Sequence, residues 1–103
     1  MPVQESEFIR LADQELHYLQ ERLELLADEN IDDIDLLEGI LYIKLRDSSE
    51  YVINKHYPSL QIWVSSPISG GYHFSYIALK SGWWTLQNIE LRNILSKELG
   101  IQL

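Results

Sequence analysis

The sequence predicts an α+β fold: a two-layer α/β sandwich in which an N-terminal and a C-terminal helix pack on one face of an antiparallel sheet of about six strands. Helical apolar periods lie at the two ends of the chain, and short runs with a two-residue period lie between them. The links between these runs are too short for crossover helices, so neighbouring strands are antiparallel. The length of 103 residues fits a single domain over residues 1–103.

The first helix is expected over residues 8–27. Ser6 precedes it and is the predicted N-cap, because a serine oxygen can accept a hydrogen bond from a free backbone amide. One face carries the apolar stripe of an amphipathic helix, formed by Phe8, Leu11, Ala12, Leu16, Leu19, Leu23 and Leu26. The opposite face carries an exposed polar row with the same spacing, formed by Gln14, His17, Glu21, Glu24 and Asp28.

Six short strands are expected after Asn30, where apolar and polar residues begin to alternate. The alternation places them at 33–36, 41–45, 50–54, 60–65, 72–78 and 83–84. Turn-forming residues separate them, at Glu38–Gly39, Asp47–Ser49, Pro67–Gly71 and Ser81–Gly82. Trp83 and Trp84 fall on opposite faces of the last strand, so one of the two is expected in the core.

The second helix closes the chain. Asn88 is its predicted N-cap, Gly100 is placed to end it, and Ile101 is expected to fold back onto the core. Its apolar stripe consists of Leu91, Ile94, Leu95 and Leu99. A sheet with both helices on one face is the economical way to bury two such stripes.

The formal net charge of −8 is concentrated in the first part of the chain. Residues 1–38 hold twelve acids against two bases, whereas the remaining residues hold four acids against six bases. A negative field of this kind repels nucleic acid and anionic membranes and attracts cations or a basic protein surface. We therefore expect neither nucleic acid nor membrane among the partners.

Composition also limits the cellular setting. No apolar run approaches the roughly 20 residues of a membrane helix, and no cysteine is present to form a disulfide, a thiolate metal site or a nucleophile. Residues 1–5 carry neither a basic run nor an apolar stretch, so we expect no secretory signal and no mitochondrial presequence. These features favour a cytoplasmic protein, in a bacterial cytosol or a compartment descended from one.

The strongest candidate for metal binding is a group of acids at the end of the first helix and the start of the sheet. We call it the acidic ridge: Glu21, Glu24, Asp28, Glu29, Asp32, Asp33 and Asp35. Carboxylates suit iron in either oxidation state, and also calcium and manganese. Without histidine or cysteine ligands, such a site is expected to be weak and labile. The alternative is a solvated helix face that only confers solubility.

Two observations bear on that choice. Acids at Asp28 and Glu29 lie near the negative end of the helix dipole, where they are unfavourable, and this cost supports a functional role. His17 lies four residues before Glu21 and could share a metal with it, although a simple surface histidine is the favoured interpretation. His56 and His73 form no recognisable metal motif in the sequence.

Trp63 is the candidate contact residue. It alternates with the apolar residues of its strand, so it points away from the helices, and an exposed tryptophan is a common interface anchor. The alternative is that it packs against cross-strand neighbours such as Tyr42 or His73.

Catalysis has little support in the sequence. Several serines precede His73, but no acid is placed to orient that base, and no phosphate-binding loop, dinucleotide fingerprint or HExxH motif is present. We therefore do not predict an enzyme.

The segment from Asn54 to Gly70 resembles the signature of the frataxin family. That signature runs Asn, a base, Gln, any residue, Pro, two of any kind, Gln, an aliphatic residue and Trp, and often continues to Ser-Pro-x-Ser-Gly. His56 departs from it, because it stands where the signature has Gln. The segments Gly71–Phe74 and Ser6–Phe8, the latter followed by Leu11-Ala12-Asp13, resemble the bacterial branch, and the likeness spans nearly the whole chain.

The resemblance implies an iron-binding accessory factor of iron–sulfur cluster assembly. Such a factor docks on the cysteine desulfurase and its iron–sulfur scaffold protein, as a regulator or an iron donor. Iron, as Fe²⁺ or Fe³⁺, would bind weakly at the acidic ridge of a monomer, and Asn54, Gln61 and Trp63 would contact partners. The alternatives are a ferroxidase or iron-storage protein that oligomerises with iron, and a plain interaction domain whose acids serve a basic partner.

Overall fold

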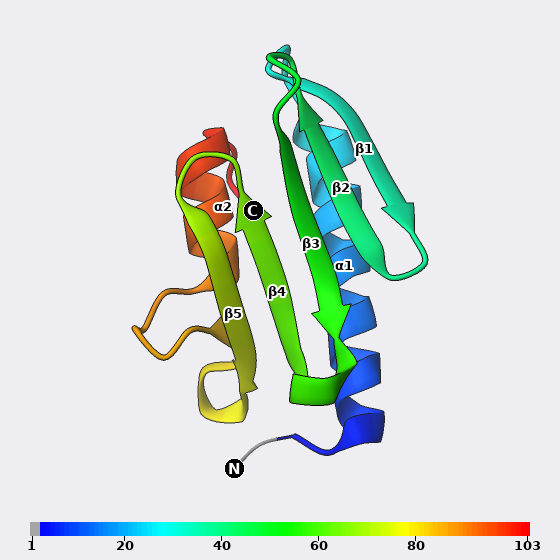
Figure 1. The fold of residues 1–103 in the computed structure, drawn as a ribbon, viewed down its shortest axis with the longest axis vertical. Helices are drawn as coiled ribbons and strands as arrows, with labels where there is room; N and C mark the ends of the chain where they lie inside the picture. Colours follow the sequence, from blue (N-terminus) through cyan, green and yellow to red (C-terminus); the bar gives the residue numbers. More distant parts are fainter. Residues whose placement is uncertain (1–2) are drawn as a thin grey trace.

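The computed structural model describes residues 3–103 and confirms the predicted fold class (Figure 1). A long helix comes first, six strands follow, and a short helix ends the chain. Single 3-10 turns at Tyr57–Ser59 and Ala78–Lys80 join β3 to β4 and β5 to β6. The elements are α1 Glu5–Leu26, β1 Ile31–Leu37, β2 Ile40–Leu45, β3 Glu50–His56, β4 Gln61–Ser66, β5 Gly70–Ile77, β6 Gly82–Trp84 and α2 Leu91–Leu99.

The six strands form an antiparallel meander in chain order. Each strand pairs with the next one along the chain, as the short turns require. The β1–β2 turn is tight because Glu38 and Gly39 both adopt positive φ, at 51° and 77°. At the β2–β3 turn, Asp47 Oδ1 accepts a hydrogen bond from the Ser49 amide at 2.9 Å.

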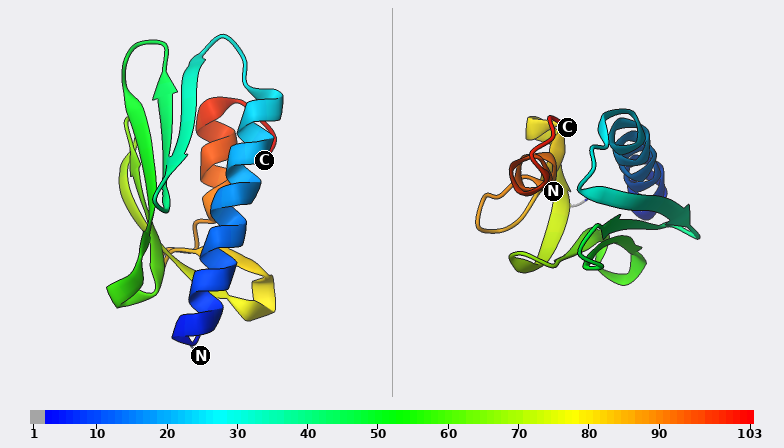
Figure 2. Two further views of the ribbon diagram at one scale, coloured as in Figure 1. Left: turned by 90° about the vertical axis from the view of Figure 1, so that its right-hand side faces the viewer. Right: turned by 90° about the horizontal axis from the view of Figure 1, so that it is seen from above.

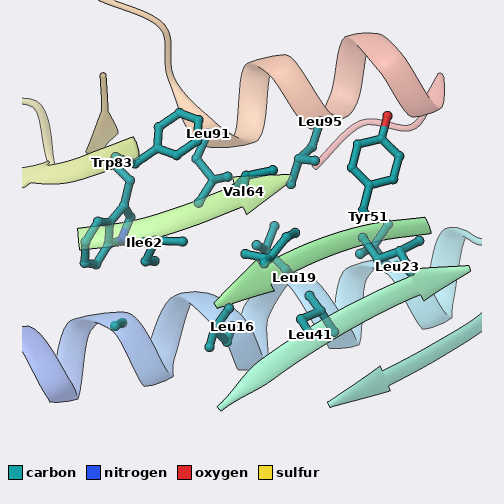
Figure 3. Packing of buried hydrophobic residues seen from close by; sticks show 14 of the residues in the cluster. Leu16, Leu19, Leu23, Leu41, Tyr51, Ile62, Val64, Trp83, Leu91 and Leu95 are labelled. Carbon is teal, nitrogen blue, oxygen red and sulfur yellow. The ribbon is translucent and has the colours of Figure 1, made fainter. Parts of the chain in front are cut away.

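Both helices lie on the same side of the sheet (Figure 2). The predicted stripes supply the core: Phe8, Leu16, Leu19 and Leu23 of α1 are at most 1% exposed, and so is Leu95 of α2. They meet the inward side chains of the sheet, which include the buried Trp83 (Figure 3). Trp84, on the other face of β6, is only partly buried. The other face of the sheet has no helix over it.

A partly buried ion pair joins the two helices. Glu15 of α1 is only 6% exposed, and its carboxylate accepts two hydrogen bonds from the Arg92 guanidinium of α2, at 2.8 and 2.9 Å. The hydrogen bond to Glu15 raises the pKa of Arg92 above its ordinary value. Over residues 3–103, no helix is both long and apolar enough to cross a membrane.

Both predicted N-caps are wrong. Gln4 is the N-cap of α1 and Glu90 is the N-cap of α2, and neither makes a side-chain cap hydrogen bond. Ser6 lies inside the first turn of α1, which therefore begins earlier than expected. Asn88 adopts a positive φ of 67°, and its Oδ1 accepts a hydrogen bond from Lys80 Nζ at 2.7 Å. The Asn88 side chain therefore contacts the neighbouring turn and does not form the α2 cap that the local pattern predicts.

Candidate functional site

The acidic ridge lies at the C-terminal end of α1 and along β1. Glu21, Glu24 and Asp28 belong to the exposed side of α1 and the residues directly after it. Glu24 lines a shallow hollow of about 230 Å³ together with Asp32 and Asp33. The structure therefore brings helix and strand members of the ridge to one place on the surface.

Local backbone geometry exposes the acids of β1. The Asp28 carboxylate accepts a hydrogen bond from the Asn30 amide at 2.9 Å, in the turn that leads into the strand. A β-bulge then interrupts the pairing between Ile31 and Asp33. Regular alternation would turn one of two neighbouring residues inward, but Asp32 and Asp33 are both exposed.

Almost all of the ridge charge is uncompensated. Within residues 3–103, Glu29 is the one ridge member with an ion pair, to Arg46 at 3.8 Å, and both side chains are largely exposed. By contrast, two acids of α1 outside the ridge are neutralised by structural pairs: Asp13 with Lys55 at 2.6 Å, and Glu15 with Arg92. Lys55 and Arg92 thus pair with acids outside the ridge, and within residues 3–103 six of the seven ridge acids have no ion pair.

The ridge is an array of separate carboxylates. Within residues 3–103, no three His, Asp or Glu side chains are grouped so that they could hold one metal ion. His17 is exposed, and its Nδ1 lies 2.8 Å from the Asp13 backbone oxygen, which fixes the ring on α1. Metal sharing between His17 and Glu21 stays a prediction. Such a surface can attract cations, but ligands would have to move together to bind one.

The second candidate surface is the uncovered face of the sheet, where Trp63 lies between two histidines. The ring of His56 stacks on one side of the indole at a centroid distance of 3.6 Å, and the ring of His73 stacks on the other at 4.1 Å. Both interplanar angles are 10°. Trp63 therefore presents the edge of its ring, and the two imidazoles cover its faces.

The three predicted contact residues lie together on this face. Asn54 of β3 is paired with Trp63 of β4, which is paired with His73 of β5. Trp63 Nε1 donates a hydrogen bond to Gln61 Oε1 at 3.0 Å, and Gln61 Nε2 donates to Ser75 Oγ at 3.1 Å. These bonds hold the indole in one orientation.

The stack shows that Trp63 packs against His73, one of the two cross-strand neighbours named in the alternative interpretation; Tyr42 is not paired with it. Sequence reasoning missed that His56 joins the stack, because His56 and His73 lie far apart in the chain. The signal was present in the alternation of the strands: His56 and His73 fall on the same face as Trp63 once the antiparallel register is known.

Sequence reasoning also missed a hydrogen-bonded network around Glu98. Its carboxylate accepts hydrogen bonds from the hydroxyls of Tyr51 and Ser66, both at 2.7 Å, and from the hydroxyl of Ser69. The amides of Ile68 and Ser69 donate to Ser66 Oγ at 3.1 Å. The serines of the β4–β5 turn are therefore bound to α2 and are not paired with a catalytic histidine.

The network shifts two pKa values. Burial, the largest single effect, favours the neutral form of Glu98, but hydrogen bonds from Ser69, Ser66 and Tyr51 together outweigh it and hold the pKa of Glu98 below its ordinary value. Burial, reinforced by the bond to Glu98, raises the pKa of Tyr51. Glu98 is therefore a carboxylate at neutral pH, and Tyr51 is its permanent donor.

The whole chain matches one family model. A model described as a frataxin-like domain matches residues 1–103. The mitochondrial frataxin homolog of Schizosaccharomyces pombe is 40% identical over 89% of this chain and 61% of its own length. The mitochondrial frataxin of Arabidopsis thaliana is 37% identical over 94% of this chain and 54% of its own length. The chain thus spans a little over half of the length of these relatives.

Solved structures agree with the sequence comparison. A trimeric frataxin from the yeast Saccharomyces cerevisiae superimposes with a TM-score of 0.79 at 33% identity, over 87% of this chain and 76% of that one. A trimeric yeast frataxin complexed with ferrous iron gives 0.71 at 30% identity, over 97% and 86%. A frataxin from Psychromonas ingrahamii shares the fold, with a TM-score of 0.77 at 24% identity over 98% and 96%.

Proposed function

Because the chain belongs to the frataxin family, we propose that it is an iron-binding accessory protein of iron–sulfur cluster assembly. In this proposal it binds iron weakly at the acidic ridge and docks on a cysteine desulfurase and its scaffold protein, as a regulator or an iron donor. It acts as a monomer and without catalysing a reaction of its own.

The observation that carries the proposal is the uncompensated charge of the ridge. Six of its seven acids have no ion pair within residues 3–103, whereas Asp13 and Glu15 outside it are neutralised. Crowded carboxylates repel one another, and a bound cation relieves that repulsion. A related yeast frataxin has been solved with ferrous iron, which supports iron as the cation.

Iron binding is tested by following backbone amide signals while ferrous iron is added without oxygen. We expect the amides of residues 21–35 to broaden first and those around Trp63 to stay sharp, because only the ridge concentrates carboxylates. Equal broadening over both surfaces contradicts a localised site.

A pair of matched variants separates the ridge from net charge. Glu21→Lys combined with Glu24→Lys reverses two ridge charges, and Glu7→Lys combined with Glu50→Lys makes the same charge change at exposed positions elsewhere. Iron binding and docking to the desulfurase should be lost in the first variant and kept in the second. If the ridge variant folds and still binds both as the wild type does, the ridge is only a solvated face.

Partner contact at the sheet is tested by Trp63→Ala. The variant leaves the ridge charge intact, so iron binding should persist, while binding to the scaffold complex weakens by about 2 kcal/mol if Trp63 is an interface hot spot. Calorimetric titrations of the same variant with ferrous iron and with the scaffold complex measure the two affinities. A Trp63→Ala protein that binds the scaffold complex at wild-type strength contradicts the assignment of this face.

A ferroxidase or iron-storage protein is the second candidate, favoured by the trimeric form of the yeast relatives. Storage requires oligomers that grow with iron, whereas a docking factor needs only the monomer. Sedimentation with and without excess ferrous iron, combined with oxygen uptake, distinguishes them. Cytoplasmic location stays a prediction, since the names of the matching curated relatives place those proteins in mitochondria.

A further inference from the structure

The centre of the uncovered sheet face carries no permanent charge. Its acids and bases lie toward its margins: Asp33 and Asp35 on β1, Lys44 on β2, Glu50 at the start of β3, and Lys80 over the Trp84 ring of β6. The outward residues that remain on the three central strands include no aspartate, glutamate, lysine or arginine: Val52, Asn54, His56, Gln61, Trp63, Ser65, Gly71, His73, Ser75 and Ile77. The two histidines are the titratable side chains among them.

The contacts of the two imidazoles are with uncharged side chains. His56 contacts Trp63 and, through Nδ1, the Ser59 hydroxyl at 2.6 Å, and His73 contacts Trp63. On the flank formed by β6, Lys80 lies over the Trp84 ring at 4.1 Å and Glu90 is bridged to the backbone of Trp84. Within residues 3–103, neither histidine takes part in an ion pair.

Protonation of an imidazole changes the charge of this stack. A cation over the face of an indole is attracted by the negative charge of the ring, so the stacked geometry is compatible with a charged imidazole. Histidine is the side chain that gains its charge near physiological pH. The arrangement therefore lets a small fall in pH place positive charge at the centre of an otherwise neutral face.

We propose that the His56–Trp63–His73 stack is a proton-dependent recognition element, which binds a carboxylate of an acidic protein segment when its imidazoles are charged. The proposal deepens the partner contact proposed above and rests on it for the identity of the partner. A protein carboxylate fits because it complements the positive charge of the imidazolium locally. An extended polyanion such as nucleic acid is repelled by the net charge of −8. Two parallel rings with an indole between them also cannot share one metal ion, and no three-ligand group includes them within residues 3–103.

The first test needs no partner. The indole N–H signals of the three tryptophans are followed from about pH 5.5 to about pH 8.5, the range in which imidazoles titrate. We expect the Trp63 signal to move along a titration curve and the Trp83 and Trp84 signals to stay in place. His56→Gln combined with His73→Gln should abolish that movement, and His17→Gln, which changes the histidine outside the stack, should preserve it. A Trp63 signal that does not titrate in the wild type overturns the proposal.

The second test uses glutarate as the carboxylate probe at constant ionic strength. Glutarate should shift the signals of Trp63 and its neighbours at about pH 6 and leave them unmoved at about pH 8, because charge-assisted hydrogen bonds to carboxylate require the imidazolium. The His56→Gln, His73→Gln protein should show no shift at either pH. Equal shifts at both pH values, or shifts that survive in that variant, overturn carboxylate recognition.

The scaffold protein provides the third test. Its binding should strengthen about fivefold between about pH 8 and about pH 6, as expected when a neutral hydrogen bond becomes charge-assisted, and the double glutamine variant should bind with no pH dependence. Binding that is insensitive to pH in the wild type overturns the proposal. If the scaffold does not bind at any pH, the proposed partner is wrong, and the first two tests alone decide whether the stack recognises carboxylates.

Discussion

At the scale of single residues, two carboxylates each accept several side-chain hydrogen bonds. Glu15 accepts two hydrogen bonds from the Arg92 guanidinium, and Glu98 accepts hydrogen bonds from three hydroxyl groups of β3, β4 and the β4–β5 turn. Each joins segments that are distant in the sequence. Removing the charge of either one weakens several hydrogen bonds at once, because charge-assisted bonds are stronger than neutral ones.

Replacing Glu98 tests this at one position. Glu98→Gln keeps the size of the side chain but replaces three charge-assisted hydrogen bonds by neutral ones, so we expect the free energy of unfolding to fall by about 2 kcal/mol. Urea denaturation measures it. Glu50→Gln is the matched control, because it makes the same substitution at an exposed residue outside the network. Equal losses in the two variants show that the network contributes nothing specific.

The lowered pKa of Glu98 predicts that the free energy of unfolding depends on pH. Folding lowers the pKa of Glu98 below its ordinary value of 4.5, so the folded state favours the carboxylate. The stabilisation is complete above that ordinary pKa and is lost as pH falls through the lower pKa of the folded state. Wild type should therefore lose more stability than Glu98→Gln on acidification below pH 4.5. Parallel acid denaturation curves for the two proteins contradict this.

At the scale of elements, the ends of the helices were harder to predict than their existence. The 22 residues of α1 follow from the apolar stripe, but its first turn begins at Glu5 without a side-chain cap. The end of α2 was predicted: Gly100 adopts a positive φ of 69°, and its amide donates to the Ser96 carbonyl at 2.9 Å. Glycine is suited to this position because a side chain strains the left-handed conformation.

Substitution of Gly100 should weaken α2 through the backbone alone. No atom lies within 4 Å of a Cβ placed there, so Gly100→Ala creates no clash, and the strain of positive φ should cost about 1 kcal/mol. Gly100→Asn is the control, because asparagine tolerates this conformation better and should lose less. Thermal unfolding compares the two. An alanine variant as stable as the wild type contradicts the cap.

At the scale of the whole molecule, charge is distributed unevenly over a conventional core. The sandwich buries an apolar cluster from both helices and the inner face of the sheet. Its opposite face holds the histidine–tryptophan stack, and one end holds the acidic ridge. The two candidate surfaces thus centre on different places, and Asp33 and Asp35 of the ridge lie on the same sheet face as the stack.

The ridge predicts how stability responds to salt. Its carboxylates repel one another in the folded state, and salt screens that repulsion, so the melting temperature at neutral pH should rise with ionic strength. The Glu21→Lys, Glu24→Lys protein should respond less, because its repulsion is already relieved. A melting temperature that is flat or falls as salt is added counts against a strained ridge.

By itself the sequence determined the layers of this protein. Burial follows a 3.6-residue period in helices and a two-residue period in strands, so the stripe of α1 and the alternation of the six strands could be read locally. The same patterns placed Trp63 on the outer face and gathered the ridge acids at the end of α1. Local turn chemistry likewise predicted Gly39 and Gly100.

Only the tertiary structure decided which distant side chains meet. The stack of His56 and His73 on Trp63 depends on the register of three strands, and the Glu98 network joins α2 to Tyr51 and Ser66 across the fold. The bulge that exposes both Asp32 and Asp33 also breaks the local alternation. The local period of a helix or strand indicates the face on which a side chain lies. The neighbours of that side chain are set by strand pairing and helix docking, which no local pattern encodes.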